Sequence, residues 1–191
     1  MAIPDYQSIM LPLLRFASDG TEHTTRESVN RLADEFNLTE EERKEMLPSG
    51  TAKLFDNRVG WASTYLRKAG LIESPKKGVF KITERGKDVL SQNPENIDVK
   101  YLEQFPEFVE FKKPKKDKID GSVTATLGTD DVNPEETLEK AYQELKDTLS
   151  SELLQTIKDG SPEFFERLVV DVLLRMGYGG SRDGRWARRA G

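Results

Sequence analysis

The sequence contains no cysteine and a single histidine, His23, among its 191 residues. Without cysteine the chain can form neither a disulfide nor a thiolate zinc site, and we expect it to work in a reducing cytoplasm. One histidine argues against a histidine-rich metal cluster and against a histidine-dependent nucleophile. No apolar run approaches the length of a membrane span, and residues 1–5 lack the basic start and apolar stretch of a signal peptide. We therefore expect a soluble protein of one or two small domains, with no membrane contact.

The net charge of −5 hides a strong unevenness along the chain. Residues 58–87 hold eight basic and two acidic side chains, whereas residues 119–180 hold five basic and thirteen acidic ones. A local excess of positive charge in a mildly acidic region indicates where an anionic partner would bind. The low overall pI therefore does not argue against a nucleic-acid partner.

Hydrophobic periodicity predicts that the N-terminal half is mainly α-helical. Two of its helices open with a Thr-x-x-Glu capping box, in which the threonine oxygen accepts an amide and the glutamate reaches back. Gly, Pro and Asn residues, which favour turns, lie in the segments between the helices. The expected helices lie near residues 6–17, 24–36, 39–47 and 51–69.

The periodicity changes after the fourth of these helices. Short strand-like runs at 71–73 and 79–82 flank the turn-forming residues 74–78, which predicts a β-hairpin with a basic tip. Thr83 caps a further helix. This order of elements, in which short helices are followed by a long helix and then by a hairpin, is typical of a winged helix-turn-helix domain. We assign this domain to residues 1–95.

The C-terminal half has a different organisation. Residues 96–133 read as aromatic helical pieces followed by a flexible linker. A new helix is expected at Asn133-Pro134, with a cap and a proline at its first position, and another at Ser161-Pro162. These two helices cannot bury their apolar faces alone, so we interpret residues 134–180 as the start of a second domain. Residues 181–191 read as an unstructured tail.

The fourth helix is the candidate recognition helix, because its outward positions carry Asn, Arg, Ser, Thr and Lys. Such side chains hydrogen-bond base edges in a major groove or neutralise phosphates, and lysines at the hairpin tip would contact the neighbouring backbone. A solvated basic face is the alternative. The clustering of charge on the two elements that a winged helix uses favours double-stranded DNA. The predicted DNA-binding residues are Asn57, Arg58, Ser63, Thr64, Arg67, Lys68, Lys76, Lys77 and Lys81.

Two aromatic residues, Trp61 and Tyr65, lie four positions apart on the same helix. They could stack on DNA bases, but packing against the hairpin is the role we expect. For catalysis the sequence offers little: Asp183-Gly184 alone does not make a nuclease centre, and the chain has no glycine-rich phosphate loop.

Three segments, residues 38–43, 57–71 and 78–86, closely resemble the N-terminal domain of Mrr restriction-system proteins. The resemblance covers about residues 4–92. It implies a winged helix that binds DNA and is joined by a linker to a nuclease domain of the PD-(D/E)xK class. In that family the nuclease cleaves modified, typically methylated, foreign DNA with a divalent metal, and Mg²⁺ is expected for the full-length protein.

Residues 164–180 resemble the opening helix of that nuclease domain, and Glu166 matches the family's helix glutamate. The family continues with an Asp in a Gly-Asp-Gly-type segment and a strand with Gln-Ala-Lys-type residues, and neither follows in this sequence. We therefore expect two helices of an incomplete, truncated α/β nuclease domain that is inactive, with no metal site and no cofactor. Glu166 is then a solvent-facing residue, because one carboxylate does not hold a catalytic metal.

The leading hypothesis is the DNA-binding part of an Mrr-type restriction endonuclease that serves in DNA defence, with a homo-oligomer possible. The alternative is a stand-alone winged-helix transcriptional regulator, which would bind a palindromic operator as a dimer. A third hypothesis makes the first domain an interaction module for other restriction subunits. DNA binding that is unchanged by Arg67→Ala together with Lys77→Ala would favour this third hypothesis.

Overall fold

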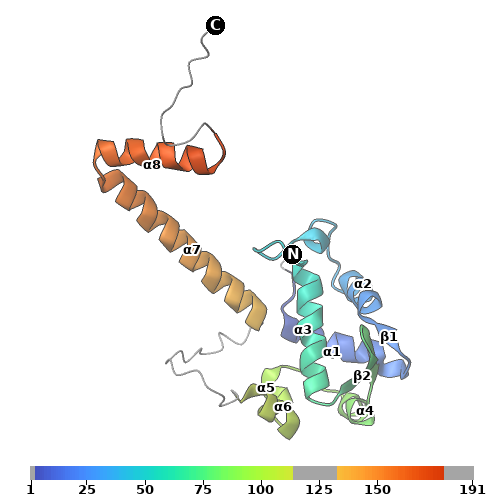
Figure 1. Cartoon of the computed structure of the whole chain (residues 1–191). Helices are drawn as coiled ribbons and strands as arrows, with labels where there is room; N and C mark the ends of the chain where they lie inside the picture. Colours follow the sequence, from blue (N-terminus) through green and yellow to red (C-terminus); the bar gives the residue numbers. More distant parts are fainter. Residues whose placement is uncertain (1–2, 114–132, 179–191) are drawn as a thin grey trace. The chain divides into compact units, whose positions relative to one another are not determined.

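The computed structural model describes residues 3–113 and 133–178, which fall into two compact units, residues 1–141 and 142–191. The described residues are mainly helical, with one small three-stranded antiparallel sheet in the first unit (Figure 1). None of the described helices combines the length and the apolar character that crossing a membrane requires.

Three helices pack around one apolar core in the first unit: α1 (Tyr6–Phe16), α2 (Thr25–Glu35) and α3 (Leu54–Lys68). The capping box predicted for α2 is present. The hydroxyl of Thr24 accepts the amide of Glu27, and the Glu27 carboxylate accepts the amide of Thr24. The largest fully buried side chains of α1 and α3 are Ile9, Met10, Leu13, Leu14, Phe55, Val59 and Leu66.

The helix predicted over residues 39–47 is only a 3-10 turn, Glu42–Lys44. Beyond it the backbone turns back on itself, because the amide of Leu47 donates to the carbonyl of Ala52 and Met46 forms a β-bridge with Lys53. This pairing uses the backbone groups that a longer helix would need. For the same reason α3 starts three residues later than the sequence predicts.

The sheet consists of β1 (His23–Thr24), β2 (Ile72–Lys76) and β3 (Val79–Ile82), in the order β1-β3-β2. The predicted hairpin is confirmed as the antiparallel pair of β2 and β3, with Gly78 in its turn at a φ of +76°. The short strand β1, which the sequence analysis missed, pairs with β3 from the segment just before α2. Helix α4 (Glu84–Ser91) follows the hairpin.

The first unit continues past the hairpin and α4. Helices α5 (Val99–Leu102) and α6 (Pro106–Lys112) pack against α3, and Phe108 of α6 is completely buried with its ring centroid 5.4 Å from that of Tyr65. Phe108 is therefore part of the core of the first unit, and Tyr101 and Phe105 pack against this core.

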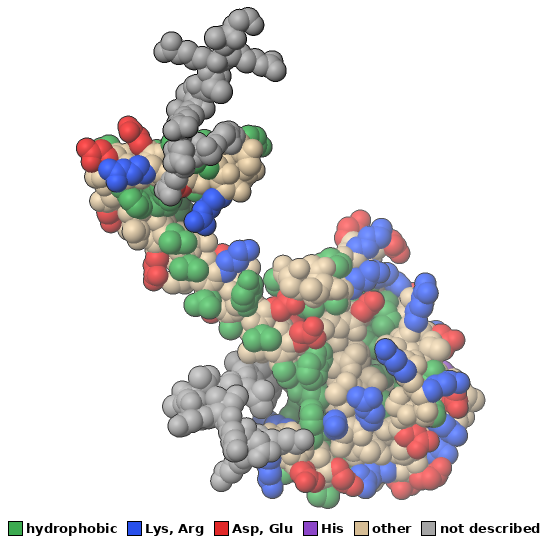
Figure 2. Space-filling view, viewed as in Figure 1, with side chains coloured by type: hydrophobic (Ala, Val, Ile, Leu, Met, Phe, Trp, Pro, Cys, Tyr) green, Lys and Arg blue, Asp and Glu red, His purple; other side chains and the backbone are tan. Residues whose placement is uncertain are grey.

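Helix α7 (Pro134–Asp159) begins where the sequence predicts, and the side-chain oxygen of Asn133 accepts the amide of Glu136. Helix α8 (Pro162–Arg175) begins at the predicted Ser161 cap. Hydrophobic side chains follow α7 along its exposed surface (Figure 2). The large exposed apolar residues of the two helices are Leu138, Tyr142, Leu145, Leu149, Leu153, Leu154, Phe164, Phe165, Val169, Val170, Val172, Leu173 and Met176.

Candidate nucleic-acid interface

Helix α3 divides its side chains between a buried face and an exposed face. Arg67 and Lys68 lie in its last turn, where positive side chains interact favourably with the helix dipole. The helix stops at Gly70, whose φ of +74° is a left-handed conformation that side chains disfavour. The buried face, with helical spacing, consists of Phe55, Val59, Ala62 and Leu66.

A groove of about 160 Å³ lies between the exposed face of α3 and the β2–β3 hairpin. Three of the predicted DNA-binding residues, Ser63, Thr64 and Arg67, line it together. Their hydroxyl and guanidinium groups are donors and acceptors of the kind that read base edges. The hairpin contributes Ile72, Ser74, Gly78, Val79 and Phe80, and the start of α2 contributes Thr25.

The turn of the hairpin is held in place by α2. The backbone amide of Thr25 donates to the carbonyl of Gly78 at 3.0 Å, and the Thr25 hydroxyl donates to the same carbonyl at 3.3 Å. Nothing local in the sequence indicates this contact, because its two partners lie 53 residues apart. This contact fixes the position of the hairpin turn relative to the helices.

The three predicted hairpin lysines lie on the β2–β3 hairpin, and two of them are exposed. Lys76 forms an exposed ion pair with Glu22, with 3.2 Å between the ammonium nitrogen and the carboxylate oxygen. Exposed pairs of this kind are worth at most about 1 kcal/mol, so a phosphate can replace the carboxylate at little cost. Within the described residues, Lys77 and Lys81 form no ion pair. On the face drawn in Figure 2, Lys and Arg side chains are interspersed with Asp and Glu over the first unit.

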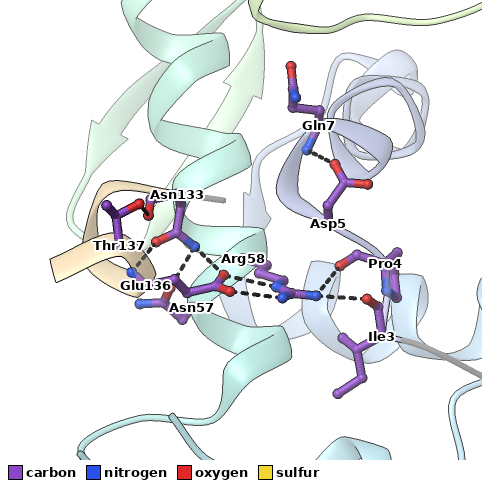
Figure 3. A network of polar contacts seen from close by, with 9 residues as sticks. All are labelled: Ile3, Pro4, Asp5, Gln7, Asn57, Arg58, Asn133, Glu136 and Thr137. Atoms are coloured by element: carbon purple, nitrogen blue, oxygen red, sulfur yellow. Dashed lines mark hydrogen bonds and ion pairs between the residues drawn. The ribbon is translucent and has the colours of Figure 1, made fainter. Parts of the chain in front are cut away.

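Asn57 and Arg58, which were also predicted to bind DNA, do not line this groove. Both make hydrogen bonds within the chain instead. Asn57 contacts Glu135. Arg58 contacts Glu136 (Figure 3). The Arg58 side chain is only 16% exposed. The structure thus separates these two residues from Ser63, Thr64 and Arg67 on the same helix.

The expectation that Trp61 and Tyr65 pack against the hairpin is wrong. Tyr65 makes edge-to-face contacts with Tyr6 of α1 and Phe108 of α6, with ring centroids 5.3 and 5.4 Å apart, and Trp61 stacks edge-on against Tyr65. Burial raises the pKa of the Tyr65 hydroxyl, and its hydrogen bond with Tyr6 opposes the rise. Tyr65 contacts Phe108 and Phe111 of α6, and the sequence did not reveal that this helix packs on α3.

Lys68 lies on the same side of α3 as this aromatic cluster. Its ammonium is 5.0 Å from the centroid of the Phe111 ring, in a cation–π contact, while the side chain stays exposed. Lys68 is therefore the member of the predicted set at the border between the groove and α6.

A second hollow, of about 690 Å³, lies between α2, the Glu42–Lys44 turn and the start of α3. Thr25 borders both this hollow and the groove, so the two are neighbours. The basic residues that line the second hollow were not predicted to bind DNA, because they are scattered singly among acidic residues in the sequence. They are Arg26, Arg43, Lys44 and Lys53.

Glu166 lies on α8 with its side chain exposed. No group of three or more His, Asp or Glu side chains that could hold a metal ion occurs within residues 3–113 and 133–178. The residues that the structure describes therefore do not fit the divalent metal of the resembled nuclease domain. Asp183, the other acidic residue considered in the sequence, lies outside the described residues.

Comparison with known proteins places these elements in a family. Residues 6–92 match the Mrr N-terminal domain, a stretch that contains α1 to α4 and the whole sheet. The chain is also similar to the type IV methyl-directed restriction enzyme EcoKMrr of Escherichia coli (strain K12), with 32% identity over 96% of this chain. The chain spans 62% of that enzyme's length. No solved structure matches the chain. Residues 6–92, which carry the candidate interface, are thus the part of the chain that is similar to the Mrr N-terminal domain.

Proposed function

We propose that the first unit is a winged-helix DNA-binding domain and that it forms the recognition part of an Mrr-type restriction endonuclease directed at modified foreign DNA. In this proposal α3 is the recognition helix and the β2–β3 hairpin is the wing. The observation that carries it is the groove in which Ser63, Thr64 and Arg67 of α3 face the hairpin. The similarity to the E. coli relative, which is a methyl-directed restriction enzyme, supports the choice of modified DNA as the target.

The chemistry of the groove suits a major-groove contact. Arg67 carries a planar guanidinium that can donate two parallel hydrogen bonds to a guanine edge, and Ser63 and Thr64 each supply a hydroxyl. Arg67 is exposed, and Ser63 and Thr64 are half-buried where they line the groove. We assign base contacts to these three residues.

The hairpin and the neighbouring hollow suit phosphate contacts. Lys76, Lys77 and Lys81 would neutralise the DNA backbone on one side of α3, and the basic residues of the second hollow, such as Arg26 and Lys53, would do so on the other side. The hydrogen bonds of Thr25 to the hairpin turn keep these two sides at a fixed spacing. Such contacts position a protein on DNA but carry no sequence information.

The test is a titration of a fluorescent DNA duplex with the 191-residue chain at several salt concentrations, by anisotropy. Arg67→Ala together with Lys77→Ala should weaken binding. Because Lys77 is assigned a phosphate contact, its loss should lower the magnitude of the slope of log K against log salt by about 0.9, whereas the loss of the Arg67 base contact should weaken binding by about 1–3 kcal/mol at each salt concentration. The matched control is Arg15→Ala together with Lys100→Ala, which removes the same charge from exposed sites on α1 and α5 outside the groove.

Three outcomes bear on the proposal. Binding that falls in the groove variant and stays near the wild-type value in the control supports it. Equal effects of both variants would leave only nonspecific attraction of a positive surface and would overturn the assignment of the groove. A duplex pair that differs only in cytosine or adenine methylation tests the substrate class, and equal affinity for both duplexes would refute recognition of modification by this unit.

We further propose that α7 and α8 correspond to the first helices of the nuclease domain of that family. Their long exposed apolar faces support this assignment, because such faces belong against further structure. We assign no catalytic step to the residues that the structure describes, among which no group of three or more His, Asp or Glu side chains could hold a metal ion. The function proposed here is DNA recognition.

A further inference from the structure

The first turn of α7 is docked on α3, although the two segments are separated by 78 positions in the sequence (Figure 3). Asn133 and Glu136 are 0% and 6% exposed, which is rare for polar residues on a helix that is otherwise largely exposed. Buried polar groups persist when their hydrogen bonds are satisfied.

Arg58 is the centre of the site. Its Nε and Nη2 donate to the two carboxylate oxygens of Glu136 at 2.9 and 2.8 Å, which is the bidentate geometry of a strong ion pair. Its remaining nitrogen, Nη1, donates to the backbone carbonyls of Ile3 and Pro4 at 2.7 and 3.1 Å. Every nitrogen of this guanidinium thus has a partner, and its position is fixed from both sides.

Asn133 joins the same network from the start of α7. Its amide nitrogen lies 2.6 Å from the carboxylate of Glu136 and 3.1 Å from the side-chain oxygen of Asn57, and its own side-chain oxygen caps the helix. No buried side-chain polar atom among the described residues lacks a partner. A network satisfied in this way specifies one arrangement, because each group in it orients the next.

Two further carboxylates lie at the rim of the site. Glu135 accepts hydrogen bonds from Asn57 at 2.6 Å and from the indole of Trp61 at 3.1 Å, and Glu139 accepts the backbone amide of Ser49 at 3.1 Å. Asn57 lies one helical turn before the groove-lining stretch of α3 that starts at Gly60. The docked turn therefore places negative charge beside the surface that we assign to DNA.

We propose that residues 133–139 are an intrachain acidic ligand of α3 that competes with DNA. This inference rests on the proposed function of α3. In the docked state the acidic turn occupies Asn57 and repels phosphates at the edge of the recognition surface. Because coupling between two ligands of one protein is reciprocal, DNA binding weakens docking by the same factor by which docking weakens DNA binding.

The size of the effect follows from Coulomb's law. A carboxylate about 10 Å from a phosphate in water changes the binding constant by about twofold, and the effect fades as salt shortens the screening length. Removing both rim charges by Glu135→Gln with Glu139→Gln should therefore raise DNA affinity by about fourfold at low salt. Glu136→Gln should also raise affinity, because it loosens the anchor around Arg58 on the side away from the groove.

A crosslink gives the sharpest test, because the chain has no cysteine of its own. Ser49→Cys together with Glu139→Cys replaces a pair of side chains that are in hydrogen-bond contact, and a short bis-maleimide then ties α7 to the first unit. The same variant without the linker is its own control. Glu144→Gln with Glu152→Gln is the matched control for the charge variants, since it removes two carboxylates from exposed positions farther along α7.

The expected result is that the crosslinked chain binds DNA more weakly than the uncrosslinked one, and that the rim and anchor variants bind more tightly than the Glu144 and Glu152 control. If the crosslinked and uncrosslinked chains bind DNA with equal affinity, the inference is overturned. The proposed function still stands in that case, provided that Arg67→Ala with Lys77→Ala weakens binding. DNA binding that is insensitive to Arg67→Ala with Lys77→Ala would instead overturn the proposed function and this inference with it.

Discussion

The packing of α6 on α3 makes a quantitative prediction about where the first cooperative unit ends. Phe108 is fully buried against Tyr65, whereas its neighbour Phe111 is 39% exposed. Replacing a buried phenylalanine with alanine costs about 3–5 kcal/mol, because apolar contacts are lost and a cavity remains. Phe111→Ala removes the same atoms from a partly solvated site and should cost much less. The comparison therefore isolates burial from residue type.

Urea denaturation of the full chain, followed through tryptophan emission, measures the difference. With a slope of about 2 kcal/mol per molar urea, Phe108→Ala should lower the midpoint by about 2 M. Hydrogen exchange adds a second readout. If α6 belongs to the same cooperative unit as α1, the amides of Leu13 and Leu14 should exchange at least about a hundredfold faster in Phe108→Ala, since each 1.4 kcal/mol is a factor of ten.

A specific pattern would refute this reasoning. If Phe108→Ala speeds exchange only within residues 99–112 and leaves the amides of α1 unchanged, then α5 and α6 are a separate layer that opens on its own. If Phe108→Ala and Phe111→Ala shift the urea midpoint equally, the burial of Phe108 does not contribute as described.

Two further predictions concern local structure. Gly86→Ala would place a Cβ 2.2 Å from the Leu71 carbonyl oxygen and should destabilise the first unit by about 1–3 kcal/mol in urea denaturation. Gly60→Ala, where a Cβ meets nothing within 4 Å, should stabilise it by about 0.5–1 kcal/mol. The opposite order of the two stabilities would contradict the packing of α4. The hydrogen bond from the Thr24 amide lowers the pKa of the Glu27 carboxyl below its ordinary value of 4.5, and the Thr24 hydroxyl lowers it further. The ionised carboxylate therefore stabilises the fold above pH 4.5, and this contribution is lost as the pH falls through the lowered pKa. Stability curves of wild type and Glu27→Gln should therefore differ near neutral pH and converge in acid, and curves that stay parallel down to pH 2 would show that the capping box contributes nothing through Glu27.

The sequence alone determined much of the first unit, because its local signals agree with its tertiary contacts. The helix caps at Thr24, Asn133 and Ser161 are read from residue types whose short side chains bond a nearby amide, and each is present in the structure. The alternation at 79–82 and the turn at Gly78 likewise predicted the hairpin. Of the residues that helical spacing predicted on the outward face of α3, Ser63, Thr64 and Arg67 line one groove, whereas Arg58 is mostly buried.

The features that sequence reasoning missed depend on contacts between distant segments. The β1 strand has two residues and forms because β3 offers it an edge, which no local pattern at His23 indicates. The 39–47 helix shrinks because the following residues turn back and take its backbone partners. In both cases segments compete for the same backbone hydrogen-bonding groups. Local propensity does not predict the outcome, because it takes no account of a partner segment elsewhere in the chain.

Helix α3 illustrates both levels. Its sequence determined a face rich in Arg, Asn, Ser and Thr, and the likeness of residues 6–92 to the Mrr N-terminal domain gave that face its expected role. Only the tertiary structure decided that Arg58 is directed into a bidentate pair with Glu136 while Arg67 is left at the groove. The two arginines look alike in the sequence. They differ because a guanidinium is drawn to whichever carboxylate and carbonyl groups the fold brings within reach, and those of Arg58 come from the chain's first residues and from α7.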